Sequence, residues 1–156
     1  MTAGEDSLDA LLPQAEPMIL LSGYEPQKEE RVVDAWVDVS PSSPFYEVEL
    51  GGVPGCVALE YMAQTMALCV GFLRQRNGLK PKIGFVLGSR KLTVTVPCFR
   101  SGERYRVRAE CTYQDESFGS FDCTIIEKSG AVVASAQMTA FQPDDDMTPE
   151  KLKEFT

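Results

Sequence analysis

The chain has 156 residues, which is enough for one compact domain with a buried core and leaves no room for a second. It contains no histidine. This absence excludes any metal site, catalytic triad or general base that would use a histidine of this chain. The net charge of −8 disfavours nucleic-acid binding. We expect neither a cofactor nor a metal.

The N-terminal residues and the cysteines indicate the compartment. Residues 1–9 carry three acidic residues and no basic one, whereas a secretory signal opens with positive charge. The five cysteines are an odd number with no C-x-x-C pair, so we interpret them as reduced thiols. These features predict a cytoplasmic protein whose residues 1–9 form a flexible tail.

Short elements are expected before the first long apolar segment. After one helical turn ended by Pro13, residues 18–21 are predicted to form a buried strand. Residues 31–39 alternate apolar and polar side chains, which predicts a half-buried strand anchored by Trp36. Residues 40–54 contain three prolines and a Gly-Gly pair, which favours an ordered loop.

A long helix is predicted for residues 55–77, because apolar side chains occur around its whole circumference. Pro54 before it and Gly78 after it are typical start and stop signals. The length approaches that of a membrane span, but Glu60 and Gln64 interrupt the apolar run. We therefore expect no membrane insertion and a central helix wrapped by a sheet.

The remaining segments alternate as strands do. Residues 92–96 alternate, and a hairpin turn is expected at Ser129 and Gly130 before a strand over residues 131–141. One strand is expected to place its apolar side chains on one face, namely Tyr105, Val107, Ala109, Cys111 and Tyr113. An antiparallel meander follows from this pattern, and residues 144–156 are expected to be an acidic tail with a short helix.

The order of elements predicts an α+β fold in which a curled antiparallel sheet of about five to six strands wraps one long helix. That is the order found in the hotdog fold, here over residues 10–143. Residues 53–64 (VPGCVALEYMAQ) resemble the P-G-x-x-x-x-E-x-x-A-Q segment of the 3-hydroxyacyl-carrier-protein dehydratases. Residues 12–21 (LPQAEPMILL) resemble their opening L-P-H-x-x-P segment, with Gln14 replacing the histidine.

Two further segments resemble the subgroup that accompanies aryl-polyene, fatty-acid-like pathways: residues 86–92 (VLGSRKL) and 114–121 (QDESFGSF). The resemblance implies a substrate bound to an acyl carrier protein, and a homodimer or a heterodimer with another hotdog protein. The chain departs from the family at its catalytic histidine, which lies fourteen residues before the helix carboxylate. Here Tyr46 occupies that place.

The helix start carries the candidate site. Glu60 is expected near exposed helix amides, which favour an anion, and among apolar walls, which oppose one, so it is a candidate proton shuttle. Gln64 lies one turn later and could orient Glu60 by a hydrogen bond. We expect unpaired amides of Gly55 and Cys56 to receive the thioester oxygen. Gln64, Phe85 and Leu87 are also expected to contact substrate.

Plainer interpretations of the same residues stay open. Glu60 could be a buried acid paired with a neighbour, and Tyr46, our candidate second catalytic group, could serve packing alone. Residues 74–108 hold ten of the fifteen basic residues against the single acid Glu103. Within this stretch, Arg104, Arg106 and Arg108 could dock an acidic carrier protein or form a solvated strand face.

Three functions remain compatible with the sequence. The chain could be a dehydratase that pairs Glu60 with an unusual second group such as Tyr46, Glu47 or Glu49. It could be a weakened, acyl-binding subunit that completes the active site of a partner hotdog dehydratase. It could also be a thioesterase that works from one helix carboxylate.

Overall fold

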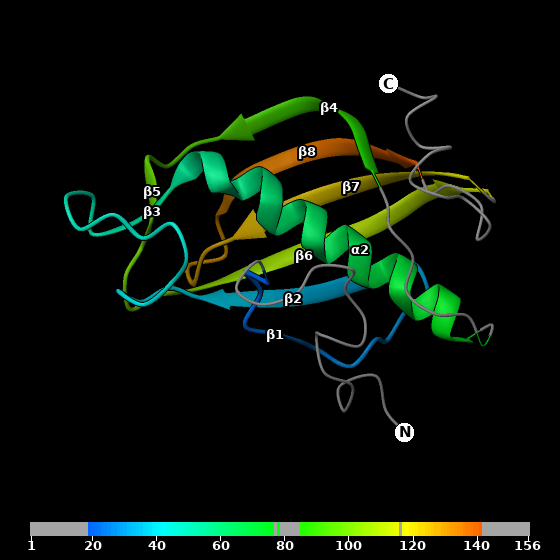
Figure 1. Ribbon diagram of the computed structural model, residues 1–156, viewed down its shortest axis with the longest axis horizontal. Helices are drawn as coiled ribbons and strands as arrows, with labels where there is room; N and C mark the ends of the chain where they lie inside the picture. Colours follow the sequence, from blue (N-terminus) through cyan, green and yellow to red (C-terminus); the bar gives the residue numbers. More distant parts are fainter. Residues whose placement is uncertain (1–18, 77, 79–84, 116, 142–156) are drawn as a thin grey trace, which may run out of the picture.

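A curled antiparallel sheet wraps one long helix in the computed structural model, which describes residues 19–76, 78, 85–115 and 117–141 (Figure 1). The six strands follow the order β1-β2-β6-β7-β8-β4. Their bounds are β1 Gly23–Tyr24, β2 Val32–Asp38, β4 Phe85–Val94, β6 Arg104–Gln114, β7 Phe118–Ile126 and β8 Val132–Phe141. The predicted α+β hotdog architecture is confirmed.

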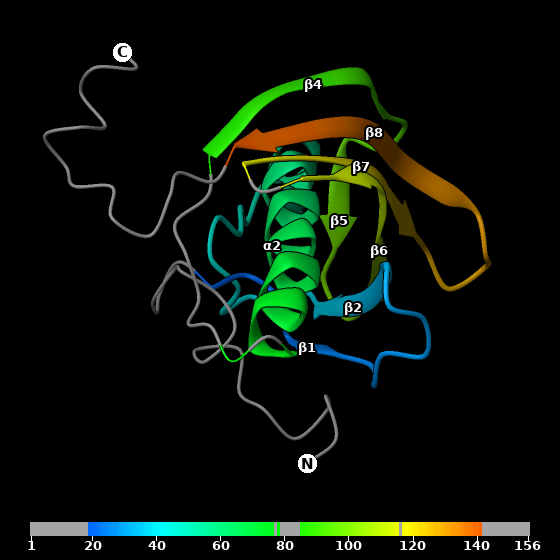
Figure 2. The ribbon, with the colours of Figure 1, turned by 90° about the vertical axis from the view of Figure 1, so that its right-hand side faces the viewer.

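The helix α2, Ala58–Arg76, lies in the concave side of the sheet and packs on β2, β6 and β7 (Figure 2). With the preceding 3₁₀ turn η2, Gly55–Val57, it is long and apolar enough to cross a membrane. Most of its described apolar side chains are instead buried inside the protein; Met62, Leu68 and Cys69 are fully inaccessible. The apolar circumference of this helix thus reflects a core helix of the fold.

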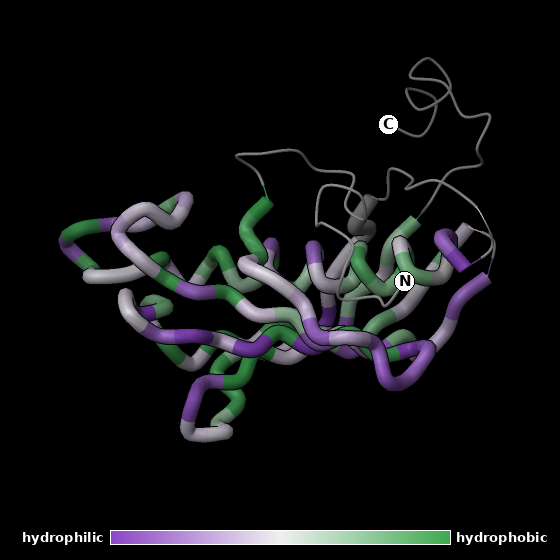
Figure 3. Tube along the Cα trace, turned by 90° about the horizontal axis from the view of Figure 1, so that it is seen from below, coloured by the Kyte–Doolittle hydropathy of each residue, from purple (hydrophilic) through white to green (hydrophobic). Residues whose placement is uncertain are grey.

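Alternation along β6 matches the prediction over most of the strand. Tyr105, Val107, Ala109 and Cys111 are buried, and the residues between them are exposed. Green and purple segments alternate accordingly along the strands in Figure 3. The predicted burial of Tyr113 is wrong: a register shift between Cys111 and Tyr113 turns this side chain outward, and it is 55% exposed.

The edge strand β4 departs from prediction for a similar reason. The expected alternation over residues 92–96 should bury Leu92, yet this side chain is 45% exposed. The pairing of β4 with β8 shifts register between Arg90 and Thr93, and Lys91 between them has a φ of 54°. Leu92 lies within this bulge, where residues are left unpaired and depart from the alternation of the strand.

Two expectations before the helix are corrected. Ile19, Leu20 and Leu21 are buried but form no strand, and the first strand within the described residues begins at Gly23. The predicted loop over residues 40–54 ends in a short strand, β3, Gly52–Pro54, which pairs with β5, Cys98–Arg100. Proline is tolerated here because it is the last residue of a two-stranded ribbon. The predicted tails, residues 1–9 and 144–156, lie outside the described residues.

Candidate functional site

The turn that starts the helix is held close to the segment between β4 and β5. The backbone N–H of Gly55 donates to the carbonyl of Pro97 at 3.0 Å. A Cβ on Gly55 would lie 2.6 Å from the carbonyl oxygen of Val96, so glycine is required by this close approach. The expectation that the Gly55 amide is unpaired is therefore wrong.

The N–H of Cys56 is the donor that remains at this turn. Among the turn, loop and cap hydrogen bonds of the described residues, none uses the Cys56 N–H. An unpaired amide in the first turn of a helix can receive an oxygen atom that carries developing negative charge. Of the two amides proposed from the sequence, the geometry leaves only that of Cys56 available for this role.

Glu60 lies in the first turn of α2 and is half-buried, neither open to bulk water nor sealed in the core. The Nε2 atom of Gln64 donates to its Oε1 at 3.1 Å, which confirms the predicted hydrogen bond between these side chains. Gln64 is fully buried, and its Oε1 accepts the backbone N–H of Leu20 at 2.8 Å. Gln64 therefore contacts Glu60, and its predicted contact with substrate stays a prediction.

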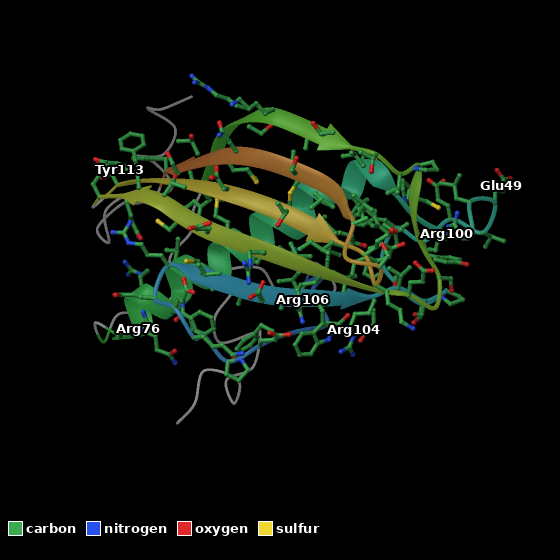
Figure 4. The ribbon with its side chains drawn as sticks, turned by 180° about the vertical axis from the view of Figure 1, so that it is seen from behind. Glu49, Arg76, Arg100, Arg104, Arg106 and Tyr113 are labelled. Atoms are coloured by element: carbon green, nitrogen blue, oxygen red, sulfur yellow. The ribbon has the colours of Figure 1, made fainter. Side chains whose placement is uncertain are left out.

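Tyr46 lies in the loop before β3 and does not reach Glu60 by a hydrogen bond within the described part of the chain. Its side chain is half-buried and packs against the core, and its N–H donates to the carbonyl of Ser43 at 3.1 Å. The neighbouring acids Glu47 and Glu49 are exposed, and Figure 4 shows Glu49 at the outer end of the molecule. A catalytic role of Tyr46 stays a prediction.

The other substrate-contact predictions fall on β4. Phe85 and Leu87 belong to this strand, but their side chains lie outside the described part of the structure. A cavity of about 800 Å³ lies at another place, between the turn before β6 and the turn between β7 and β8. Its lining includes Glu103, Arg104 and Lys128, and Glu60 does not line it.

The arginines of β6 lie on the sheet face turned away from the helix, as Arg104 and Arg106 do in Figure 4. Each is paired with an acid from the β1–β2 region, which the sequence pattern of the basic stretch did not reveal. Arg104 binds Asp38 with two hydrogen bonds of 2.6 and 2.9 Å, and Arg108 binds Asp34 at 2.9 and 3.0 Å.

Arg106 contacts Glu25 at 2.8 Å, so all three arginines are opposed by carboxylates. The hydrogen bond to the carboxylate of Asp38, and the negative charge of that carboxylate, raise the pKa of the Arg104 guanidinium. The face is consequently close to neutral rather than basic. Its role in carrier-protein docking stays a prediction.

The cysteines are all free, as predicted. Burial raises the pKa of both Cys69 and Cys123 to about 12, so these thiols stay protonated and pack in the core as small apolar groups. Cys56 is the exposed thiol, at the helix start. No group of three cysteine, aspartate or glutamate side chains in the described ranges is arranged to hold a metal ion.

The element that sequence reasoning missed is the backbone of Leu20. Its N–H fixes the amide of Gln64, and no side-chain pattern encodes such a contact. The only available signal was the resemblance of residues 12–21 to a family segment, which pointed to the region without indicating its contact. Pro97 was missed for the same reason, because its carbonyl acts through the main chain.

Comparison with known proteins gives a match to the family model described as "ApeP-like: ApeP dehydratase", over residues 6–152. The chain belongs to the ApeP-like family. One solved structure, the dehydratase heterocomplex ApeI:P from Xenorhabdus doucetiae, contains a chain that is 30% identical, with a TM-score of 0.84 and 95% coverage of each chain.

More distant solved structures share the fold alone. A hypothetical thioesterase with coenzyme A from Streptococcus pneumoniae is 19% identical with a TM-score of 0.61, over 80% of this chain and 88% of the other. The PaaI protein of E. coli is 14% identical with a TM-score of 0.58, over 76% of this chain and 80% of the other. Among curated protein sequences, none matches the chain.

Proposed function

We propose that this ApeP-like chain is a subunit of a 3-hydroxyacyl-carrier-protein dehydratase in a cytoplasmic, aryl-polyene-type pathway. The family match and the likeness to a chain of a dehydratase heterocomplex support the reaction class. The observation that carries the proposal is Glu60, half-buried in the first turn of α2 and bound to Gln64. A carboxylate held in this way is suited to proton transfer.

The elimination of water from a 3-hydroxyacyl thioester requires a base, an acid and a hydrogen-bond donor to the thioester oxygen. In our proposal the carboxylate of Glu60 takes the proton from C2, and the electron pair of that C–H bond forms the C2–C3 double bond. The C3–O bond breaks, and the hydroxyl leaves as water after receiving a proton from an acid. The N–H of Cys56 is our candidate donor to the thioester oxygen, where negative charge develops.

The acid is the missing group, which is why we propose a partner. The chain contains no histidine, and Tyr46 makes no hydrogen bond to Glu60 in the described structure. A second hotdog protein that supplies a proton donor beside Glu60 would complete the site. The similar solved chain belongs to a complex of two different proteins, which favours a heterodimer over a homodimer.

Turnover of a carrier-linked 3-hydroxyacyl substrate tests this proposal with the full chain alone and in complex with a second hotdog protein. We expect the complex to exceed the sum of its separate components by at least about tenfold, because a positioned acid or base contributes about a hundredfold or more. Equal rates for the chain alone and for the complex would contradict partner completion. Release of free thiol without dehydration would indicate a thioesterase instead.

Docking of the acidic carrier protein to the face of Arg104, Arg106 and Arg108 is testable by removing these charges together. Replacing all three by glutamine is expected to weaken carrier binding about tenfold at low salt and less at high salt, because the three opposing carboxylates then repel the carrier. Carrier affinity is measured by calorimetry at two salt concentrations.

The matched control for this docking test also replaces Glu25 by glutamine, and Asp34 and Asp38 by asparagine. This control restores a neutral face, so carrier affinity should return if long-range repulsion explains the loss. Unchanged affinity of the triple variant at low salt would mean that this face takes no part in docking.

A further inference from the structure

The amide of Gln64 joins two segments that are far apart in the sequence. Its carbonyl Oε1 accepts the N–H of Leu20 at 2.8 Å, and its Nε2 donates to Oε1 of Glu60 at 3.1 Å. Gln64 is completely buried, so bulk water does not reach its bond to Leu20, whereas its bond to Glu60 is partly buried. The segment before β1 and the first turns of α2 thus meet at a single side chain.

The chemistry of the Leu20 N–H determines how this amide is oriented. A backbone N–H can only donate, so the oxygen of the Gln64 amide must face Leu20. The NH₂ group is consequently turned toward Glu60, and the opposite orientation would place the NH₂ group against another donor. The direction of the Gln64–Glu60 bond is therefore set by the backbone of a different segment.

We infer that Gln64 is a positioning residue for Glu60, anchored by the main chain of Leu20. The Gln64 amide occupies one carboxylate oxygen and fixes the rotamer of Glu60, which leaves the second oxygen for proton transfer. This inference rests on the proposed function and specifies how its carboxylate is oriented. Misplacement of a reacting group by about 1 Å costs about a hundredfold in rate, so such an anchor has a measurable kinetic effect.

Replacing Gln64 by methionine tests the inference in the complex with the partner protein. The change preserves side-chain length and removes the hydrogen bonds to Leu20 and Glu60. We expect kcat for dehydration to fall about ten- to a hundredfold while KM stays within about twofold, because the bond orients the reacting group without holding the substrate.

The matched control is Thr65→Val, which removes a polar group equally buried in the same helix. The hydroxyl of Thr65 donates to the carbonyl of Tyr61 at 2.9 Å, and no hydrogen bond in the described part of the chain joins it to Leu20, Gln64 or Glu60. Its kcat should match that of the wild type. If Gln64→Met and Thr65→Val lower kcat equally, Gln64 serves the core alone and the inference is overturned.

A double-mutant cycle separates orientation from general stability. In a Glu60→Gln background, Gln64→Met should lower kcat no further, because the group that it orients is already gone. A full additional loss of kcat in the double variant would contradict the positioning role.

A backbone ester at Leu20 removes the anchor without changing any side chain, so it also serves if Gln64→Met does not fold. We expect it to lower kcat in the same direction as Gln64→Met, whereas an ester at Leu21 should not. An unchanged kcat with the Leu20 ester overturns the anchoring. If instead the wild-type complex shows no turnover that depends on Glu60, the proposed function itself fails and takes the inference with it.

Discussion

Replacing Glu60 by glutamine should abolish most of the dehydratase activity of the complex, with a loss in kcat of about 10²- to 10⁴-fold. Glutamine keeps the shape of the side chain but cannot accept the C2 proton. In the wild type, the NH₂ group of Gln64 donates to Oε1 of Glu60 at 3.1 Å. In the variant, the amide of the new glutamine takes the place of this carboxylate beside Gln64. The measurement is turnover of a carrier-linked 3-hydroxyacyl substrate by the purified complex.

The control for this change is Glu49→Gln, an exposed acid of the loop before β3 that the sequence had left open as a second catalytic group. Binding of the carrier-linked substrate should survive in Glu60→Gln, because the change leaves the fold and the substrate contacts intact. If Glu60→Gln keeps its kcat within about threefold of the wild type, Glu60 takes no part in acid–base catalysis. The catalytic groups would then all belong to the partner.

Replacing Phe99 by alanine should lower the free energy of unfolding by about 3–5 kcal/mol, the usual cost of deleting a buried phenylalanine. Phe99 in β5 is completely inaccessible and lies between two tyrosines. Its ring centroid is 5.3 Å from that of Tyr61 in α2 and 5.0 Å from that of Tyr105 in β6, both in edge-to-face arrangements. This side chain therefore connects helix, ribbon and sheet.

Urea unfolding monitored by the fluorescence of the single tryptophan, Trp36, measures this loss at a fixed protein concentration. Phe118→Ala is the matched control, since Phe118 is 44% exposed and its packing is limited to Phe141 among the ring contacts of the described residues. The control should cost less than about 1.5 kcal/mol. Similar losses in the two variants would mean that β5 is not a principal part of the core.

Removing the Phe99 ring should also disturb the candidate site. Phe99 pairs in register with Val53, one residue before Pro54, and Pro97 of the adjoining segment accepts the N–H of Gly55. A loosened β5 therefore releases the turn that starts the helix. We expect kcat of Phe99→Ala to fall even at temperatures where the variant is folded.

Periodicity in the sequence was sufficient for the central architecture. A helix that is apolar on every side, as at Met62, Leu68 and Cys69, can only be stable where it is surrounded, and alternation around Val107 and Ala109 indicates a sheet with one buried face. These signals are local and repeat over many residues, so they survive single irregularities. The hydrogen bond between Glu60 and Gln64 was predictable for the same reason, because it depends only on helical spacing.

Register shifts and contacts between distant segments were beyond such reasoning. The bulges that expose Tyr113 and Leu92 change which face a side chain takes, and they arise from pairing with β7 and β8 rather than from the residues themselves. Acids of β2 likewise neutralise Arg104 and Arg108 only because antiparallel pairing places the two strands side by side. Charge counted along the chain cannot contain that information.

The sequence by itself determined the long buried helix, the alternating strands and the carboxylate at the helix start, because each follows from the spacing of residues within one segment. Only the tertiary structure decided that Pro97 already holds the Gly55 amide, that Leu20 orients Gln64, and that the arginines of β6 are paired. These contacts involve backbone groups or partners brought together by folding. A backbone N–H or carbonyl is the same at every residue, so its partner is set by position in space.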